Sequence, residues 1–297
     1  EAHSFPTRRS SDLPPKITDP KANIKITYDK DDQKAKVKFV SVDDEGVETP
    51  LDTKYNIDDL TGKSGDKIPE EKVQARVDVL KSMGYDVVDN PFDQDPTFDT
   101  KKEIDQEFTI KVKPQVSTAK PVYVVEGDKP SSEKLKDAVT TKGNEKTVDE
   151  TKLPDTTDKV GDDTLTAPVT VTYGSGDNKR EETVNVPIKV VAGYPQIVPV
   201  DPKEAPKAED SINPDDYPAG SKFTYEKEPD TTTPGDKGVK VIVTDENGNE
   251  LVRVPATVRV VDSIPQYVVA DKANKQPEAK QSITPGEYPD GTEFTYE

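Results

Sequence analysis

The sequence contains no cysteine and no tryptophan, and its only histidine is His3. Without cysteine the chain has no disulfide, no thiolate nucleophile and no cysteine-ligated zinc. Without a second histidine, Ser-His-Asp and Cys-His catalytic pairs are excluded from everything after position 3. Carboxylate chemistry is the main enzymatic chemistry that these absences leave open.

Hydrophobic residues are also scarce, at 30%, against 34% charged residues and 27 prolines in 297 residues. Taken alone, this composition borders on that of disordered chains. The apolar residues nevertheless alternate with polar ones in short runs, which predicts β-strands. Small β domains with thin cores, joined in series, satisfy both observations, and the length suggests two or three of them. The net charge of −18 argues against nucleic acid or anionic membranes as partners, and no stretch is apolar enough to span a bilayer.

The stretch HSFPTRRSSDL, residues 3–13, holds the only histidine, two arginines and three serines. From Ser4 onward it resembles the translation of a short-read sequencing adapter in one reading frame. We therefore interpret residues 1–13 as adapter-derived and assign them no function. Residues 14–32 are expected to be a linker or the end of a preceding repeat.

The C-terminal half of the chain repeats itself. SINPDDYPAGSKFTYE (Ser211–Glu226) returns as SITPGEYPDGTEFTYE (Ser282–Glu297), 71 residues later. An earlier, more diverged unit opens with KPVYVVEGD at Lys120, and its closing VNVPIKVV (Val184–Val191) returns as VRVPATVRVV (Val252–Val261). A period of about 70 residues predicts a tandem array. We place its units at 114–193 and 194–263, followed by an incomplete unit at 264–297.

Each complete unit predicts a β-hairpin. Alternating runs flank the Gly-rich turn GSGDNKRE in the first unit and DENGNE in the second. Asn247-Gly248 favours a tight bend because both residues tolerate positive φ. Pro187 and Pro255 lie inside the returning strand, where a missing N–H is acceptable only at an edge or bulge. The pattern predicts small antiparallel β-sandwiches, and residues 264–297, which lack a hairpin, are expected to be poorly ordered by themselves.

These units resemble the Rib/alpha-like repeats of Gram-positive cell-wall proteins, including the YPDG type. Tyr288–Gly291 carries that tetrapeptide, and Tyr217–Gly220 differs from it at one position. The resemblance covers about residues 114–297, and the first unit departs from it most. It implies Ig-like β domains used as a stalk that holds an adhesive domain away from the cell wall. Proteins of this kind are exported without relying on disulfides, in keeping with the absence of cysteine.

Residues 33–113 do not follow the period. QKAKVKFVSVD, YDVV and EFTIKVKP predict strands, and PEEKVQARVDVLKSMG predicts a helix. The helix signals are Pro69 in the first turn, Glu70 and Glu71 at the positive end, Gly84 at the C-terminal cap, and an apolar stripe of Val73, Val77 and Leu80. A sheet crossed by one helix predicts a β-grasp-like α+β domain.

The pieces QKAKVKFV, LTGKSGDKI, MGYDVVDNPF, PTFD and DQEFTIKVKP resemble the mucin-binding domain of lactic-acid bacterial and streptococcal surface proteins along its whole length. The resemblance implies an extracellular module associated with adhesion to mucus glycoproteins. It offers no short motif from which ligand-binding residues can be carried over, so those residues stay unassigned.

Two acidic stretches could supply calcium ligands, because carboxylate oxygens are the ligands that Ca²⁺ prefers. Asp89, Asp93, Asp95 and Asp99 lie in DNPFDQDPTFD, which lacks the Gly and the terminal Glu of an EF-hand loop. DENGNE (Asp245–Glu250) is already explained as a hairpin turn. We prefer a solvated loop in the first place and a hairpin turn in the second, and assign no metal site.

Five aromatic residues of the first domain could stack on sugar rings, but in so small a domain we expect them to form the core. They are Phe39, Tyr85, Phe92, Phe98 and Phe108. The lysines of KAKVKF could meet acidic glycans, but we expect them to form the polar face of a strand with Ala35, Val37 and Phe39 turned inward.

The sequence as a whole predicts a mostly β, non-catalytic fragment of a Gram-positive surface adhesin, extracellular and attached to the cell wall. We expect a monomeric, extended chain with no cofactor and no catalytic residue, whose partner is a host mucin glycoprotein or another extracellular ligand. An alternative is that every domain present is a spacer and that the adhesive head lies outside the fragment. A hydrolase carried on this stalk would need a catalytic domain elsewhere, because the sequence offers no Trp platform or desolvated carboxylate pair for glycoside hydrolysis.

Overall fold

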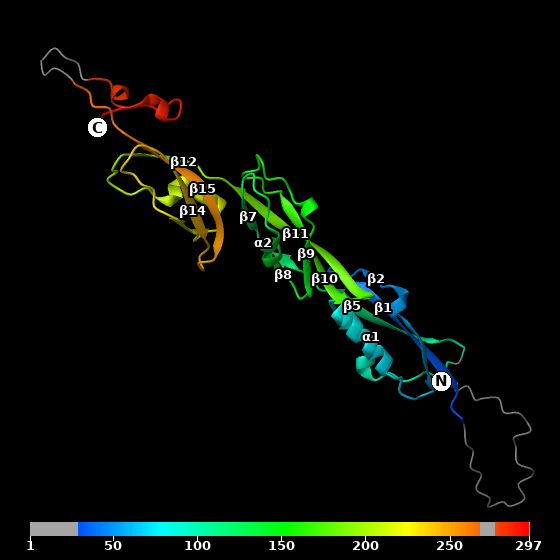
Figure 1. Cartoon of the computed structure of the whole chain (residues 1–297). Helices are drawn as coiled ribbons and strands as arrows, with labels where there is room; N and C mark the ends of the chain where they lie inside the picture. The colour runs from blue at the N-terminus through cyan, green and yellow to red at the C-terminus, as the bar shows by residue number, and fades with distance from the viewer. Residues whose placement is uncertain (1–28, 102, 268–276, 297) are drawn as a thin grey trace, which may run out of the picture. The chain divides into compact units, whose positions relative to one another are not determined.

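The structure is a computed structural model that describes residues 29–101, 103–267 and 277–296. Its contacts divide the chain into two compact units (Figure 1). The described part of the first unit comprises residues 29–76, 88–101 and 103–112, and that of the second comprises 77–87, 113–267 and 277–296. Strands dominate both units, so the expected mostly β class is confirmed. The adapter-like residues 3–13 lie outside the described residues, and the predicted domain boundaries stay predictions.

A mixed sheet with one helix forms the N-terminal part of the described chain. Its elements are β1 (Asp32–Val42), β2 (Glu48–Pro50), β3 (Ile57–Lys63), α1 (Glu71–Ser82), β4 (Tyr85–Asp89) and β5 (Gln106–Pro114). The sheet order is β2-β1-β5-β4, and β3 pairs with β1 as well. Strand β1 is antiparallel to β2 and β3 but parallel to β5, with Val37 opposite Phe108. A hairpin-type pair followed by a helix and a parallel return beside the first strand is the predicted β-grasp-like arrangement.

The alternation of β1 places its apolar residues inside, as predicted. Ala35, Val37 and Phe39 are buried, while Lys34 and Lys38 on the opposite face are exposed. A strand side chain points to the opposite face from its neighbours, so the burial pattern follows directly from the period of two.

Helix α1 also buries the predicted stripe of Val73, Val77 and Leu80. It begins at Glu71, and Gln74 N donates to Glu70 O at 2.8 Å, so Pro69 lies before the helix and not in its first turn. Gly84 has φ +74° just after the helix, the left-handed conformation expected of a C-terminal glycine.

The second unit contains two four-stranded sheets of the same topology. The first has β7 (Val122–Val125), β9 (Glu145–Val148), β10 (Thr166–Ser175) and β11 (Asn178–Val191), in the order β7-β11-β10-β9. The second has β12 (Pro195–Pro199), β13 (Lys222–Tyr225), β14 (Gly235–Thr244) and β15 (Glu250–Val261), in the order β12-β15-β14-β13. In both, the first strand is parallel to the last, so the expected purely antiparallel pairing is wrong at that edge. We call these two folded parts module 1 (residues 114–193) and module 2 (residues 194–263).

Each module closes its sheet with a short second layer. In module 1 this layer is β6 (Thr118–Ala119) paired with β8 (Val139–Thr140), beside helix α2 (Ser132–Ala138). In module 2 the corresponding contact is a single bridge that joins Ile212 to Gly193, the last residue of module 1. Sequence patterning missed α2 because so short a helix buries one leucine, Leu135, and shows no helical period.

The hairpin turns differ from each other. The turn of module 1 is two residues long, and Gly176 in it has φ +55°. In the turn of module 2, Gly248 has φ +84° and Asn247 does not have positive φ, so Asn247 does not adopt the left-handed conformation that it tolerates. Instead, the Asp245 carboxylate accepts hydrogen bonds from the backbone N–H groups of Asn247 and Asn249 at 2.9 and 2.8 Å, and this holds a wider loop.

The two strand prolines occupy positions that are edges locally. The parallel partner of β11 starts at Ile188, one residue after Pro187, and that of β15 starts at Thr257, two residues after Pro255. Each proline therefore pairs on one side only, and its missing N–H removes no hydrogen bond on the other.

The described residues 264–267 and 277–296 belong to the third repeat of the chain, which we call the third unit. They contain two 3-10 helices, Ala279–Ser282 and Pro285–Glu287, and no strand. The remainder of 264–297 lies outside the described residues. The expectation that this unit is poorly ordered therefore stays a prediction.

Candidate functional site

Two of the four acidic residues of 89–99 are held by different neighbours. Asp95 forms an ion pair with Lys67 at 2.5 Å, and the hydrogen bond and charge of that lysine lower the pKa of the Asp95 carboxyl. The Asp93 carboxylate accepts a hydrogen bond from Asn90 Nδ2 at 2.7 Å. Across the described ranges, no three His, Cys, Asp or Glu side chains gather in a way that could hold a metal ion.

Three of the five aromatic residues lie in the core, as predicted. Phe39, Phe92 and Phe98 are buried, whereas Tyr85 and Phe108 are half-buried. Phe108 packs on Phe92 with ring centroids 5.1 Å apart. The core interpretation is thus confirmed for three side chains, and the other two offer only part of a ring to a ligand.

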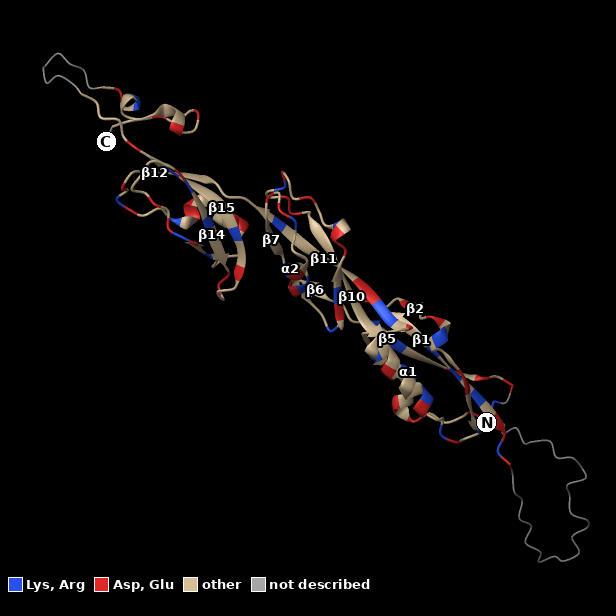
Figure 2. Cartoon of the chain, viewed as in Figure 1, with Lys and Arg blue, Asp and Glu red and all other residues tan. Residues whose placement is uncertain are grey.

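The lysines of β1 are largely neutralised across the sheet. Lys36 pairs with Asp105 and Lys38 with Glu107, both at 2.9 Å. Figure 2 shows the same mixing of the two signs of charge along the strands of both units. A cluster of free positive charge for acidic glycans is therefore not what this strand provides.

A hollow of about 500 Å³ lies where β1 and β3 meet the residues before β5. It is lined by Asp32, Gln33, Lys34, Thr61, Gly62, Lys63, Ile104 and Asp105. This volume is within the range of small-ligand pockets. The lining combines charged and hydroxyl groups with one apolar side chain, Ile104, which is 69% exposed.

Two features of this hollow were not foreseen from the sequence. The Gln33 side chain is 4% exposed, and its amide nitrogen has no hydrogen-bond partner. Gly62 leaves room for a ring, because a Cβ there would lie 2.3 Å from Phe98. Neither signal could be found by pattern, since both depend on residues that are distant in the sequence.

A polar network centred on Arg180 lies in the second unit. Arg180 Nε donates to Met83 O at 3.1 Å, and Nη2 donates to Gly84 O at 3.3 Å and Gln115 O at 2.9 Å. Its guanidinium also lies 4.2 Å from the centre of the Tyr173 ring. One side chain thus fixes three carbonyl groups from two segments of the chain.

Glu182 completes this network. Its carboxylate accepts hydrogen bonds from Ser117 N at 2.9 Å, Ser117 Oγ at 2.8 Å and Tyr173 OH at 3.0 Å. Burial alone would raise the pKa of Glu182, but these hydrogen bonds and the charge of Arg180 outweigh it and lower the pKa. The carboxylate is therefore a structural acceptor and not a proton donor at neutral pH.

Modules 1 and 2 share a hydrophobic junction. Tyr123 and Val191 of module 1 belong to the cluster of buried side chains that forms the core of module 2. The rings of Tyr123 and Tyr217 stack with centroids 5.4 Å apart and an interplanar angle of 23°.

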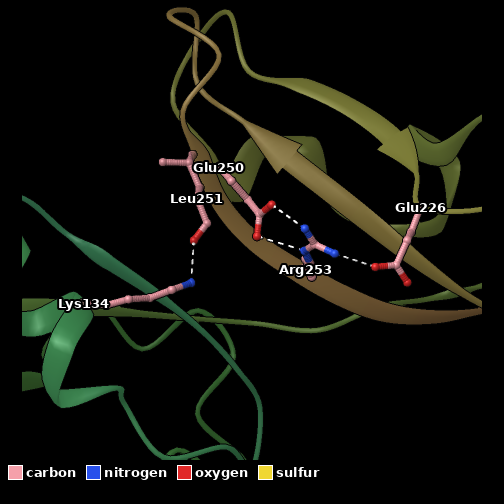
Figure 3. Close-up of polar contacts among 5 residues, drawn as sticks. All are labelled: Lys134, Glu226, Glu250, Leu251 and Arg253. Carbon is pink, nitrogen blue, oxygen red and sulfur yellow. Dashed lines mark hydrogen bonds and ion pairs between the residues drawn. The ribbon is translucent and has the colours of Figure 1, made fainter.

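Polar contacts flank this junction (Figure 3). Lys134 of α2 donates to Leu251 O at 3.4 Å. On the same strand, β15, Arg253 lies between the carboxylates of Glu250 and Glu226. A side chain of module 1 therefore reaches the backbone of β15, next to an ion-pair cluster that belongs to module 2.

Two segments of the chain match known domain families. Residues 33–114 match the model of a mucin binding domain, and residues 193–262 match the model of a Rib domain. A solved Rib structure from Streptococcus pyogenes is 29% identical to this chain and covers 24% of it and 89% of its own length, with a TM-score of 0.21. No curated protein matches the chain. No helix among the described residues is long and apolar enough to cross a membrane. The chain thus combines a segment similar to mucin binding domains with a following segment similar to Rib domains, the domain content of a surface adhesin-like repeat protein.

Proposed function

We propose that this chain acts in a cell-wall surface adhesin of a Gram-positive bacterium. Residues 33–113 would contact a host mucin glycoprotein, and the repeat modules after them would serve as a stalk without catalysis. The observation that carries the proposal is the match of residues 33–114 to a mucin binding domain. The shared sheet order of modules 1 and 2 supports the stalk, because a repeated module in series adds length without adding a new site.

Within the first domain, the hollow between β1, β3 and Ile104 is the contact surface we favour. Glycans are rich in hydroxyl groups, and Thr61 and Lys34 supply a hydroxyl group and an ammonium donor there. Ile104 offers an exposed apolar side chain against which a sugar ring can pack.

Binding of the full chain to immobilised mucin tests the proposal. The surface is used intact and after glycosidase treatment, at physiological and at high salt. We expect binding that falls after deglycosylation and changes little with salt, because most lysines near the hollow are paired with acids.

Variants then locate the contact. We expect Ile104→Ser to weaken binding about tenfold if the side chain is an anchor, since that factor corresponds to roughly 1.4 kcal/mol. Val47→Ser is the matched control, because Val47 is 58% exposed and lies away from the hollow. Equal loss of binding in both variants would contradict the assignment of the hollow.

The spacer hypothesis remains the second candidate. It is favoured by the burial of Phe39, Phe92 and Phe98, which leaves few exposed rings for sugar stacking. A folded chain that fails to bind intact mucin would support this hypothesis and overturn the adhesive role of residues 33–113.

A further inference from the structure

The tyrosine of the YPxG turn is buried at the junction of modules 1 and 2. Tyr217 is 7% exposed, and it lies between Tyr123 of module 1 and Phe223 of its own module. Tyr123 is 9% exposed. Most of both rings is therefore removed from water, although they belong to different modules.

The ring of Tyr217 makes this contact, and its hydroxyl does not. The hydroxyl oxygen is buried and has no hydrogen-bond partner. Burial raises the pKa of the phenol, so it stays neutral over the physiological range. An aromatic pair of this kind shifts an equilibrium about 2- to 12-fold beyond the effect of area alone.

The third unit holds its own turn tyrosine in the same way. Tyr288 packs on Phe294 with ring centroids 5.1 Å apart, as Tyr217 packs on Phe223 at 5.7 Å. The backbone contact also recurs, because Ile264 N donates to Ser282 O at 2.7 Å and Tyr194 N donates to Ser211 O at 2.8 Å.

The serine–tyrosine hydroxyl pair of this region recurs as well. The hydroxyl oxygens of Ser211 and Tyr225 are 3.1 Å apart, and those of Ser282 and Tyr296 are 3.0 Å apart. Tyr288, unlike Tyr217, is only half-buried. The third unit therefore presents a tyrosine that is positioned but not fully covered.

Module 2 carries the corresponding receiving position. In module 1, Tyr123 lies two residues before Val125, which pairs with the last strand residue Val191. In module 2, Ile197 lies two residues before Pro199, which pairs with the last strand residue, Val261. Ile197 is therefore the equivalent of Tyr123, and it is half-buried.

We propose that the YPxG tyrosine is the docking residue of each repeat, and that Tyr288 packs on Ile197 as Tyr217 packs on Tyr123. A covalent connection makes even a weak contact effective, because the local concentration of the neighbouring module is of the order of millimolar. Docking would give consecutive repeats one preferred arrangement in place of a free hinge. The inference rests on the stalk part of the proposed function only, so it can fail or succeed whatever the mucin assay shows.

Distances between two spin labels on the full chain test the first junction. The chain has no cysteine, so Lys152→Cys and Asn247→Cys would carry the only labels. We expect one narrow distance distribution, which Tyr217→Ala and Tyr123→Ala each broaden. Tyr217→Phe keeps the ring and should leave the distribution narrow, and so should the control Tyr267→Ala, whose side chain is almost fully exposed.

Tyr123→Ala and Tyr217→Ala together distinguish a loss of docking from a loss of folding. Tyr123→Ala removes the receiving ring and leaves the sequence of module 2 unchanged, so broadening by this variant and by Tyr217→Ala together supports docking. Broadening by Tyr217→Ala alone, or by Tyr217→Phe, would refute the ring contact.

The second junction is tested with labels at Asn247→Cys and Lys280→Cys. We expect a narrow distribution that broadens in Ile197→Ala and in Tyr288→Ala. A distribution that is already broad in the parent chain, or that neither variant changes, would restrict docking to Tyr217 and refute the recurring role.

Discussion

Replacing Glu182 with glutamine should destabilise module 1 at neutral pH and have little effect in acid. The carboxylate of Glu182 accepts three hydrogen bonds, two from Ser117 and one from Tyr173. Glutamine keeps the shape of the side chain but replaces one carboxylate oxygen with an NH₂ group and removes the negative charge. The hydrogen bonds from Ser117 N and from the hydroxyls of Ser117 and Tyr173 then no longer have a charged acceptor. A hydrogen bond to a charged group contributes about 1 kcal/mol more than a neutral one, so Glu182→Gln should cost roughly 1–3 kcal/mol at pH 7.

The pH dependence follows from the direction of the pKa shift. The pKa of Glu182 is lowered in the folded protein, so its carboxylate stabilises the fold above the unfolded value of about 4.3. That stabilisation is lost as the pH falls through the lower, folded pKa. Glutamine does not titrate, so the difference between wild type and Glu182→Gln should shrink from pH 5 toward pH 2.

Thermal unfolding of the full chain, followed by calorimetry between pH 2 and pH 7, measures this difference. One kcal/mol lowers the melting temperature of a module of this size by about 4–8 °C. Glu181→Gln is the matched control, because Glu181 is exposed and only pairs with Lys179 on the surface. The reasoning is wrong if the two variants behave alike at pH 7, or if the loss caused by Glu182→Gln persists unchanged at pH 2.

Three further predictions concern backbone fit and capping. Gly62→Ala should lower the urea midpoint by an amount corresponding to about 1–3 kcal/mol, because the new Cβ would overlap Phe98, whereas Gly238→Ala, with open space around it, should be nearly neutral. Arg180→Lys should lower the melting temperature of the second unit, because the single ammonium group of lysine cannot replace the planar guanidinium that donates to three carbonyl groups. An unchanged melting temperature would show that these hydrogen bonds do not contribute to stability. Asp245→Ala should speed hydrogen exchange at Asn247 and its loop neighbours by removing the acceptor of their N–H groups, and unchanged exchange rates would contradict that account.

Local patterns in the sequence predicted the elements of the fold well. The alternation of Ala35, Val37 and Phe39 specified which face of β1 is buried, and the spacing of Val73 and Val77 specified the buried face of α1. These signals are local, because side-chain direction repeats every two residues in a strand and every 3.6 in a helix. Turn chemistry was less reliable, since Asn247 does not share the positive φ of Gly248.

The candidate site and the junctions depended on contacts between residues that are far apart in the chain. No pattern in the sequence indicates that Gln33 and Ile104 line one hollow, or that Arg180 bonds to the carbonyl groups of Met83 and Gly84. Short elements were missed for a related reason, as with α2, whose single buried leucine carries no period.

The amino-acid order alone shows the absence of cysteine, the absence of histidine after His3, the repeat period and the strands that bury one face. The tertiary structure alone decided that β5 returns parallel to β1, that β7 and β12 pair in parallel with the last strands of their modules, and that Tyr217 packs on Tyr123. The physical reason is that burial periodicity is a property of neighbouring residues, whereas strand partners and ring contacts are selected by the packing of the whole chain.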